Sequence, residues 1–160
     1  METIKKISFT LNGKKIEIES DPMRRLLDVL REECGMTGVK EGCGEGECGA
    51  CSVFKDGLLV NSCMVPIGMC DGSTVETPEG VRESEQGKKI IDSFAESGAV
   101  QCGFCTPGMM MATEALLRQN ADPSEEEVRE ALSGNLCRCT GYDMIVEGVL
   151  KAAEGGKGLW

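Results

Sequence analysis

The chemistry that this chain can support depends on its ten cysteines and on the absence of histidine from its 160 residues. Without imidazole there can be no Ser-His-Asp or Cys-His catalytic pair, no histidine-containing zinc site, and no histidine-ligated haem or Rieske cluster. Any metal must therefore be held by sulfur or oxygen. Eight of the cysteines form two groups of four: Cys43, Cys48, Cys51 and Cys63, and Cys102, Cys105, Cys137 and Cys139.

The first group has the spacing C-x₄-C-x₂-C followed by a later fourth cysteine, which is typical of plant-type [2Fe–2S] sites. Residues 42–51 include four glycines. Glycine lets a backbone wrap tightly around a cluster and direct its N–H groups at the negative charge there. A four-cysteine zinc site is the alternative, although zinc ribbons favour two C-x₂-C knuckles. The spacing therefore predicts an iron–sulfur site.

The second group combines a C-x₂-C pair, Cys102 and Cys105, with a C-x-C pair, Cys137 and Cys139. In an extended segment the side chains at i and i+2 point to the same side, so the second pair can reach one metal site. The spacing alone leaves both iron–sulfur and zinc open. Cys34 and Cys70 have no nearby cysteine partner and are expected to be buried or mildly reactive thiols.

Composition excludes several functions. The net charge is −10 and aromatic residues make up 4% of the chain, which argues against a nucleic-acid partner, because such partners require positive charge and often stacking. The N-terminus is charged and lacks the apolar core of a signal peptide. The longest uncharged run, 97–113, is too short for a membrane span and contains Pro107. We therefore expect a cytoplasmic protein without a membrane span, whose thiols stay reduced or bind metal.

The elements that must position the first group are predicted to be mixed. Alternating apolar residues flank Asn12-Gly13 within 4–18, and a second alternating pair of runs flanks Asp56-Gly57 within 52–61; both patterns predict β-hairpins. Asp21-Pro22 is predicted to begin a helix whose apolar face includes Met23 and Leu26. A short strand is expected at 74–77. Residues 1–78 are thus predicted to form an α+β domain.

The elements around the second group are predicted to be helical. The polar stretch 79–87 resembles a linker. Helices are expected at 88–96, at 107–119 with Thr106 as N-cap, between a capping box at 122–125 and Gly134, and at 142–153. No strand is expected in this half. Residues 88–160 are therefore predicted to form a small four-helix bundle.

Four motifs, taken in order, resemble one family. They are EGCGEGECGAC at 41–51, NSC at 61–63, QCGFCTPG at 101–108 and GNLCRCTGY at 134–142. Together they span most of the chain and resemble the small iron–sulfur subunit of the molybdenum hydroxylases, the xanthine dehydrogenase family. Ser52 and Met64 depart from the residues common in the family, threonine and leucine, and neither is a ligand position.

The resemblance implies an architecture and a set of partners. It implies an N-terminal β-grasp, ferredoxin-like domain and a C-terminal four-helix domain, each holding one [2Fe–2S] cluster through its four cysteines. Electrons would pass from a molybdenum–pterin centre on a large subunit to the helical-domain cluster, then to the plant-type cluster, then to FAD on a medium subunit. Gln101 and Cys139 would contact the pterin. No substrate-converting residue is expected on this chain.

Alternatives remain at this stage. A free-standing ferredoxin needs one exposed cluster and no helical cluster domain, so the second cysteine group argues against it. A four-cysteine redox or zinc sensor is another possibility. Within the family, residues 141–146 resemble bacterial xanthine dehydrogenase small subunits and favour a purine or another N-heterocycle as substrate. Aldehydes, nicotinate, carbon monoxide and aromatic acyl-CoA esters stay open, as does the final electron acceptor.

Overall fold

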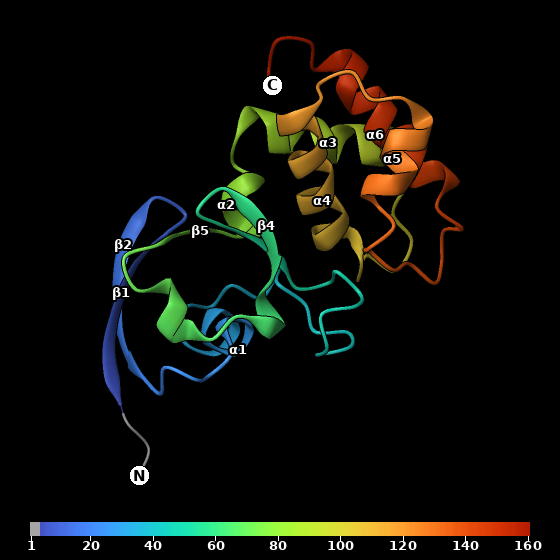
Figure 1. Ribbon diagram of the computed structural model, residues 1–160. Coiled ribbons are helices and arrows are strands. Elements are labelled where there is room, and N and C mark those ends of the chain that lie inside the picture. Colours follow the sequence, from blue (N-terminus) through green and yellow to red (C-terminus); the bar gives the residue numbers. More distant parts are fainter. Residues whose placement is uncertain (1–3) are drawn as a thin grey trace.

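The computed structural model describes residues 4–160 (Figure 1). Residues 1–3, the start of the predicted N-terminal domain, lie outside that range. The strands are β1 (Lys5–Leu11), β2 (Lys14–Ser20), β3 (Ser52–Lys55), β4 (Leu58–Asn61) and β5 (Thr74–Glu76). The helices are α1 (Leu26–Glu32), α2 (Pro78–Val81), α3 (Glu85–Glu96), α4 (Thr106–Gln119), α5 (Glu125–Ala131) and α6 (Asp143–Gly155). Two short 3₁₀ turns, Ser62–Met64 and Ile67–Cys70, follow β4.

The N-terminal part is one mixed sheet with the strand order β2-β1-β5-β3-β4. β1 and β5 are parallel at its centre, and the other neighbouring pairs are antiparallel. Both predicted hairpins are confirmed, with Asn12-Gly13 and Asp56-Gly57 at positive φ as two-residue hairpin turns require. A sheet of this order around one helix is the β-grasp arrangement, so the α+β class is confirmed.

The start of α1 was predicted wrongly. The Asp21-Pro22 signal places the N-cap at Asp21 and the first helical residue at Pro22, but the N-cap is Arg25 and the helix begins at Leu26. Arg25 is extended and forms a β-bridge with Pro66, and the N–H of Leu26 donates to the carbonyl of Val65 over 2.7 Å. Long-range pairing therefore holds this segment out of the helix. Met23, which the pattern assigned to the apolar face, is 73% exposed.

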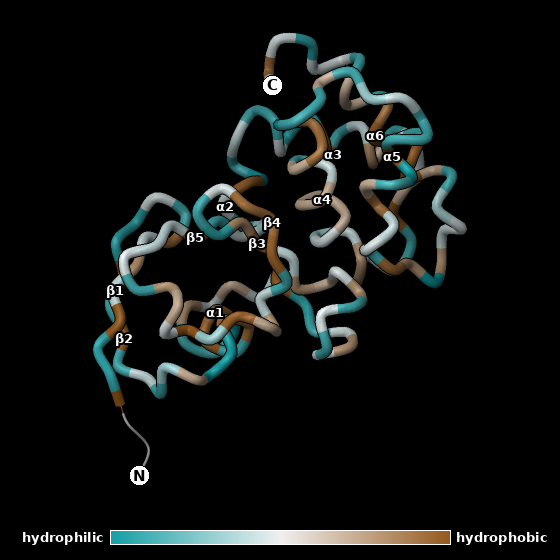
Figure 2. The backbone as a smooth tube through the Cα atoms, in the orientation of Figure 1, coloured by the Kyte–Doolittle hydropathy of each residue, from teal (hydrophilic) through white to brown (hydrophobic). Residues whose placement is uncertain are grey.

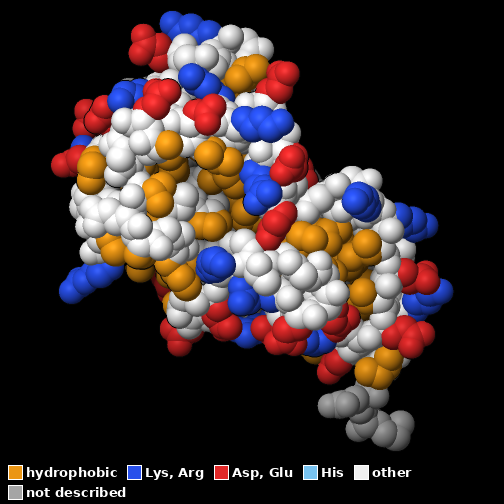
Figure 3. Space-filling model, turned by 180° about the vertical axis from the view of Figure 1, so that it is seen from behind, with side chains coloured by type: hydrophobic (Ala, Val, Ile, Leu, Met, Phe, Trp, Pro, Cys, Tyr) orange, Lys and Arg blue, Asp and Glu red, His pale blue; other side chains and the backbone are white. Residues whose placement is uncertain are grey.

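Each part has its own core. Buried side chains of α1, led by Leu26, Leu27 and Leu30, pack on Phe9 and Val75 of the sheet. The second core lies among the helices, where the brown stretches of α3, α4 and α6 face one another (Figure 2). On the opposite side of the molecule, further apolar side chains gather over the helical part (Figure 3). Phe54 of β3 also belongs to the helical core, and the division of the chain into domains 1–78 and 88–160 remains a prediction.

The segment 79–87, predicted as a linker, contains ordered helix. Pro78 is the first residue of the one-turn helix α2, and Val81 is buried in the helical core. The side chain of Ser84 caps α3 by accepting the N–H of Gly87 over 2.9 Å. This cap starts α3 three residues before the predicted residue 88. The polar composition therefore marks two helix termini instead of an irregular linker.

The remaining helices follow the sequence signals more closely. Ser124 and Glu127 form the predicted capping box at the start of α5. The N-cap of α4 is Cys105 instead of Thr106, a difference of one residue. No strand occurs in the described residues beyond β5, as predicted. Within residues 4–160, no helix is both long and apolar enough to cross a membrane.

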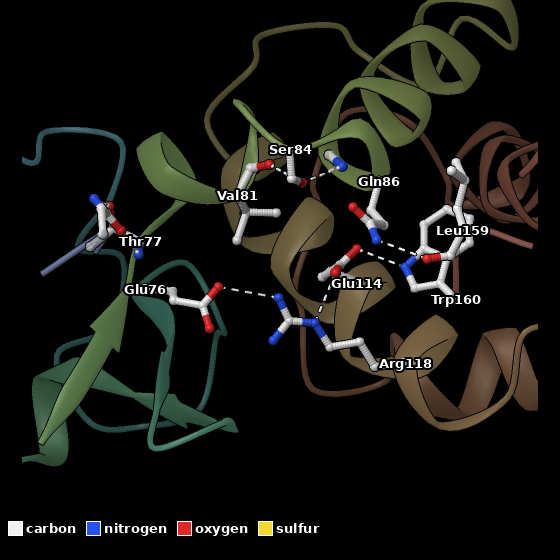
Figure 4. Close-up of polar contacts among 11 residues, drawn as sticks. Glu76, Thr77, Val81, Ser84, Gln86, Glu114, Arg118, Leu159 and Trp160 are labelled. Atoms are coloured by element: carbon white, nitrogen blue, oxygen red, sulfur yellow. Dashed lines mark hydrogen bonds and ion pairs between the residues drawn. The ribbon is translucent and has the colours of Figure 1, made fainter. Parts of the chain in front are cut away.

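An ionic and an aromatic contact join the two parts, and Figure 4 shows the ionic one, between Arg118 and Glu76. The guanidinium of Arg118, on α4, lies 4.2 Å from the ring centroid of Phe54, on β3. Its Nε donates to Oε1 of the buried Glu114 over 2.8 Å, and its second terminal nitrogen pairs with Glu76 over 3.2 Å. Nε1 of Trp160 donates to the other oxygen of Glu114 over 3.0 Å. The carboxylate of Glu114 is thus satisfied by donors on two sides.

Candidate metal centres

The first cysteine group comes together where three elements meet. Cys43, Cys48 and Cys51 lie on the loop from α1 to β3, and Cys63 lies on the 3₁₀ turn after β4. The N–H of Cys43 donates to Sγ of Cys48 over 3.4 Å, and burial and the neighbouring Cys51 raise the pKa of Cys63 to about 11. The hairpin β3–β4 is what returns Cys63 to the loop, since its two strands run antiparallel from Ser52 to Asn61.

Backbone N–H groups point at Cys43, as the glycine content predicted. Its Sγ accepts the N–H groups of Glu45 and Glu47, each over 3.3 Å. Gly44 and Gly46 alternate with these donors and have φ of +70° and +79°, which only glycine adopts readily. These hydrogen bonds lower the pKa of Cys43 to about 7. The thiolate, which is the metal-binding form of cysteine, is therefore favoured here.

The second cysteine group is gathered by helix ends. Cys105 is the N-cap residue of α4, Cys102 precedes it on the same loop, and Cys137 and Cys139 lie on the loop from α5 to α6. The N–H of Phe104 and the neighbouring Cys139 lower the pKa of Cys102, and burial and the neighbouring Cys137 raise the pKa of Cys105. Both predicted groups of four are thus brought together in space.

Thr140 and Tyr142 surround Cys137, and sequence reasoning missed both. Oγ1 of Thr140 lies 3.1 Å from Sγ of Cys137, and the N–H of Cys137 donates to the hydroxyl of Tyr142 over 2.8 Å. Burial opposes ionisation of Cys137, yet hydrogen bonds led by the one from Thr140 lower its pKa to about 7. A hydroxyl directly after the C-x-C pair was the signal that could have identified Thr140.

The donor sets distinguish between the candidate metals. A [2Fe–2S] cluster takes two thiolates on each of its two irons, whereas a zinc ion gathers all four at one centre. In residues 4–160 no three acidic, cysteine or histidine side chains are grouped closely enough to hold one metal ion. Each group offers four cysteines outside any disulfide, and Cys43 accepts two backbone N–H groups. The residues fit a [2Fe–2S] cluster at each site better than a zinc ion.

The two cysteine loops touch each other. The N–H of Leu136 donates to the carbonyl of Cys48 over 2.9 Å, and Nδ2 of the buried Asn135 donates to the carbonyl of Gly49 over 3.1 Å. Gly108 at the start of α4 also packs here, since a Cβ on it would lie 2.4 Å from the carbonyl oxygen of Gly49. Glycine is therefore required at this close approach.

The sites differ in exposure. At the first site Cys51 and Cys63 are buried and Cys43 is exposed, whereas at the second site both Cys102 and Cys139 are exposed. The neighbouring Gln101 is also exposed. Exposed apolar side chains border the second site: Val100, Phe104 and Leu136. The second site therefore exposes more of its cysteines, although both sites reach the surface.

The remaining cysteines lie outside both sites. None of the ten forms a disulfide. Cys70 is fully buried, and burial raises its pKa to about 11; burial also raises the pKa of the half-buried Cys34. Both are packed thiols of the N-terminal core, as expected.

Known proteins provide an independent comparison. A family model described as a [2Fe-2S] binding domain matches residues 77–150. The chain is 51% identical over 148 residues to the nicotinate dehydrogenase small FeS subunit of Eubacterium barkeri, covering 92% of this chain and 94% of that protein. The crystal structure of quinoline 2-oxidoreductase from Pseudomonas putida 86 matches with a TM-score of 0.90 at 42% identity, covering 96% of both chains.

Other relatives are much longer. The chain is 43% identical over 147 residues to the aldehyde oxidoreductase of Megalodesulfovibrio gigas, and it covers 90% of its own length but 16% of that protein. In that relative the matching region is thus a small part of a larger polypeptide.

Proposed function

The chain belongs to the family of small iron–sulfur subunits of the molybdenum hydroxylases, whose role is electron transfer, and on that premise we propose its place in a complex. It carries electrons from a molybdenum–pterin centre on a large subunit to FAD on a medium subunit. Its eight grouped cysteines hold two [2Fe–2S] clusters, one at each site. When bound, each cluster supplies a carrier that takes up and releases one electron at a time.

The hydrogen bond from Leu136 to Cys48 carries this proposal. Cys48 is a proposed ligand at the first site, and Cys137, which follows Leu136, is a proposed ligand at the second. One hydrogen bond and a few covalent bonds therefore connect the two ligand sets. A sensor with two independent sites would not need this connection. An electron carrier between two redox partners needs a short, rigid connection of this kind between its two clusters.

The order of the sites is proposed from the exposed residues that surround the second site. Cys102, Cys139 and Gln101 are exposed at the second site, and apolar side chains border it. Exposed apolar groups of this kind are typical of surfaces that dock a partner. We therefore place the large subunit against the helical part, with Gln101 and Cys139 contacting its pterin. The first site, where Cys43 is exposed, then lies on the side of the FAD subunit.

The substrate is proposed from chemistry that the relatives share. Nicotinate and quinoline, named in two of them, are both aromatic rings that contain nitrogen. We propose an N-heterocyclic substrate, bound on the large subunit. The aldehyde oxidoreductase relative keeps an aldehyde as the second candidate. A cytoplasmic location for the complex also remains a prediction.

The experiment is rapid mixing of the native complex with substrate, with nicotinate, a purine, quinoline and an aldehyde tried in turn. Replacing Gln101 with Ala should slow reduction of the clusters by substrate and leave their reoxidation through FAD almost unchanged. Gln119→Ala, which alters another exposed glutamine at the end of α4, serves as the matched control. If Gln101→Ala slowed only the reoxidation of the clusters through FAD, the proposed order of the sites would be wrong.

A further inference from the structure

At the second site a side-chain hydroxyl, that of Thr140, contacts a cysteine sulfur. At the first site the corresponding contacts come from backbone N–H groups. At the first site, Cys43 accepts hydrogen bonds from the N–H groups of Glu45 and Glu47. At the second site, a side-chain hydroxyl, that of Thr140, lies 3.1 Å from Sγ of Cys137. A hydroxyl can be removed by substitution without altering the backbone, so its effect can be isolated.

The direction of this hydrogen bond follows from its second partner. The N–H of Tyr142 donates to Oγ1 of Thr140 over 3.2 Å. A threonine hydroxyl has one hydrogen, and its oxygen can accept while that hydrogen donates. Cys137 as a metal-bound thiolate has no hydrogen to give. Thr140 is therefore the donor and Sγ of Cys137 the acceptor.

Tyr142 holds this arrangement in place. It has a φ of +73°, a conformation that is rare for a bulky residue and that persists only where the surroundings impose it. Here its ring packs against the helical core, and its hydroxyl accepts the N–H of Cys137 over 2.8 Å. Tyr142 thus contacts both ends of the segment between the two residues, Cys137 through its hydroxyl and Thr140 through its N–H.

We propose that Thr140, positioned by Tyr142, raises the reduction potential of the cluster at the helical site by donating a hydrogen bond to the ligand sulfur of Cys137. A donor draws electron density from the sulfur. The reduced cluster carries one more negative charge than the oxidised one, so the hydrogen bond stabilises the reduced form more. This inference rests on the proposed function, because it requires Cys137 to be a cluster ligand.

The test is a redox titration of the complete complex followed by electron paramagnetic resonance (EPR). Thr140→Val keeps the branched shape and removes the hydroxyl. We expect the reduction equilibrium of the helical-site cluster to shift about tenfold toward the oxidised form, a fall of about 59 mV for one electron. The cluster at the first site is the internal reference, and its reduction potential should not change. Thr140→Ser, which keeps a hydroxyl, should restore most of the wild-type potential.

The outcomes separate this inference from the proposed function. If the wild type shows no second cluster, the proposed function fails. If Thr140→Val has both clusters at wild-type iron and spin counts and an unchanged helical-site potential, the inference about Thr140 is wrong. An equal fall in the reduction potentials of both clusters would overturn the inference as well.

A second variant and a second measurement keep the inference testable if Thr140→Val fails to assemble the helical-site cluster. Thr140→Ala removes the hydroxyl without a branch and should give the same shift. Electron–nuclear double resonance of the wild type needs no substitution. It should show a proton coupled to the reduced helical-site cluster that exchanges rapidly in deuterium oxide, because Thr140 is half-buried. The absence of such a proton would overturn the inference.

Discussion

The N–H of Leu136 donates to the carbonyl of Cys48 over 2.9 Å, across 88 positions of sequence (136 − 48). This contact joins the loop of the plant-type cysteine group to the loop of the helical group. Asn135 and Gly108 reinforce it, since both pack directly against Gly49. The separation of the two sites is therefore fixed by backbone atoms, which leaves little room for it to vary.

The first prediction is that Gly108→Ala disturbs this junction. A Cβ on Gly108 would lie 2.4 Å from the carbonyl oxygen of Gly49, a backbone atom that cannot rotate away. We expect a loss of about 1–3 kcal/mol in the free energy of unfolding and slower electron transfer between the sites. Urea unfolding followed by visible absorption and freeze-quench EPR measure the two effects. Gly134→Ala, where the Cβ meets nothing within 4 Å, should be near neutral. Equal behaviour of the two variants would contradict the prediction.

The second prediction concerns the contact at the far end of α4. Arg118→Ala removes the cation over Phe54 and one donor to Glu114, whose side chain is 3% exposed. Leaving this buried carboxylate with fewer partners should cost roughly 1–3 kcal/mol. Arg129→Ala breaks pairs whose partners are exposed and should cost about 0–1 kcal/mol. Thermal unfolding of the two variants side by side tests this difference, and an equal loss would refute it.

The third prediction is the effect of removing iron. Residues 41–49 and 136–141 contain no helix or strand, so we expect ligation to add strongly to the few hydrogen bonds that hold them. The apo chain should exchange backbone hydrogens much faster in these loops, while the centres of α3 and α6 stay protected by their buried faces. Hydrogen exchange followed by mass spectrometry measures this. The same protection of both loops with and without iron would rule out a structural role for the clusters.

The sequence predicted the cysteine chemistry more completely than it predicted where each helix begins and ends. Local signals located both hairpins and the capping box of α5, because turn residues and caps act within a few positions. The start of α1 was missed because Arg25 is paired with Pro66, about 40 residues away, and no local pattern records that contact. The helices within 79–87 were missed because a polar stretch can also contain helix caps.

The candidate site shows the same difference between what local sequence signals predict and what long-range contacts decide. Cysteine spacing predicted the two groups of four, but it could not reveal that the N–H of Leu136 donates to the carbonyl of Cys48. That contact depends on how the two cores pack together. Thr140 and Tyr142 were missed because their role lies in hydrogen bonds that only the folded loop forms.

The fourth prediction assigns the cysteines. Cys48→Ala should lose about half of the iron, because it removes a ligand from one of two clusters. Cys34→Ala and Cys70→Ala should leave the iron content unchanged, since both residues are packed thiols of the N-terminal core and belong to neither group of four. Metal analysis of the three variants tests the assignment. Iron loss from either core variant would place that residue among the ligands.

The most direct test of the central claim is metal analysis together with EPR spectroscopy of the anaerobically purified complex. Two four-cysteine sites predict about four iron and four sulfide ions for each copy of this chain, two of each at each site. After reduction, two distinct [2Fe–2S] signals of about one spin each are expected. Zinc in place of iron, or one signal instead of two, would contradict the account of this chain as a two-cluster electron carrier.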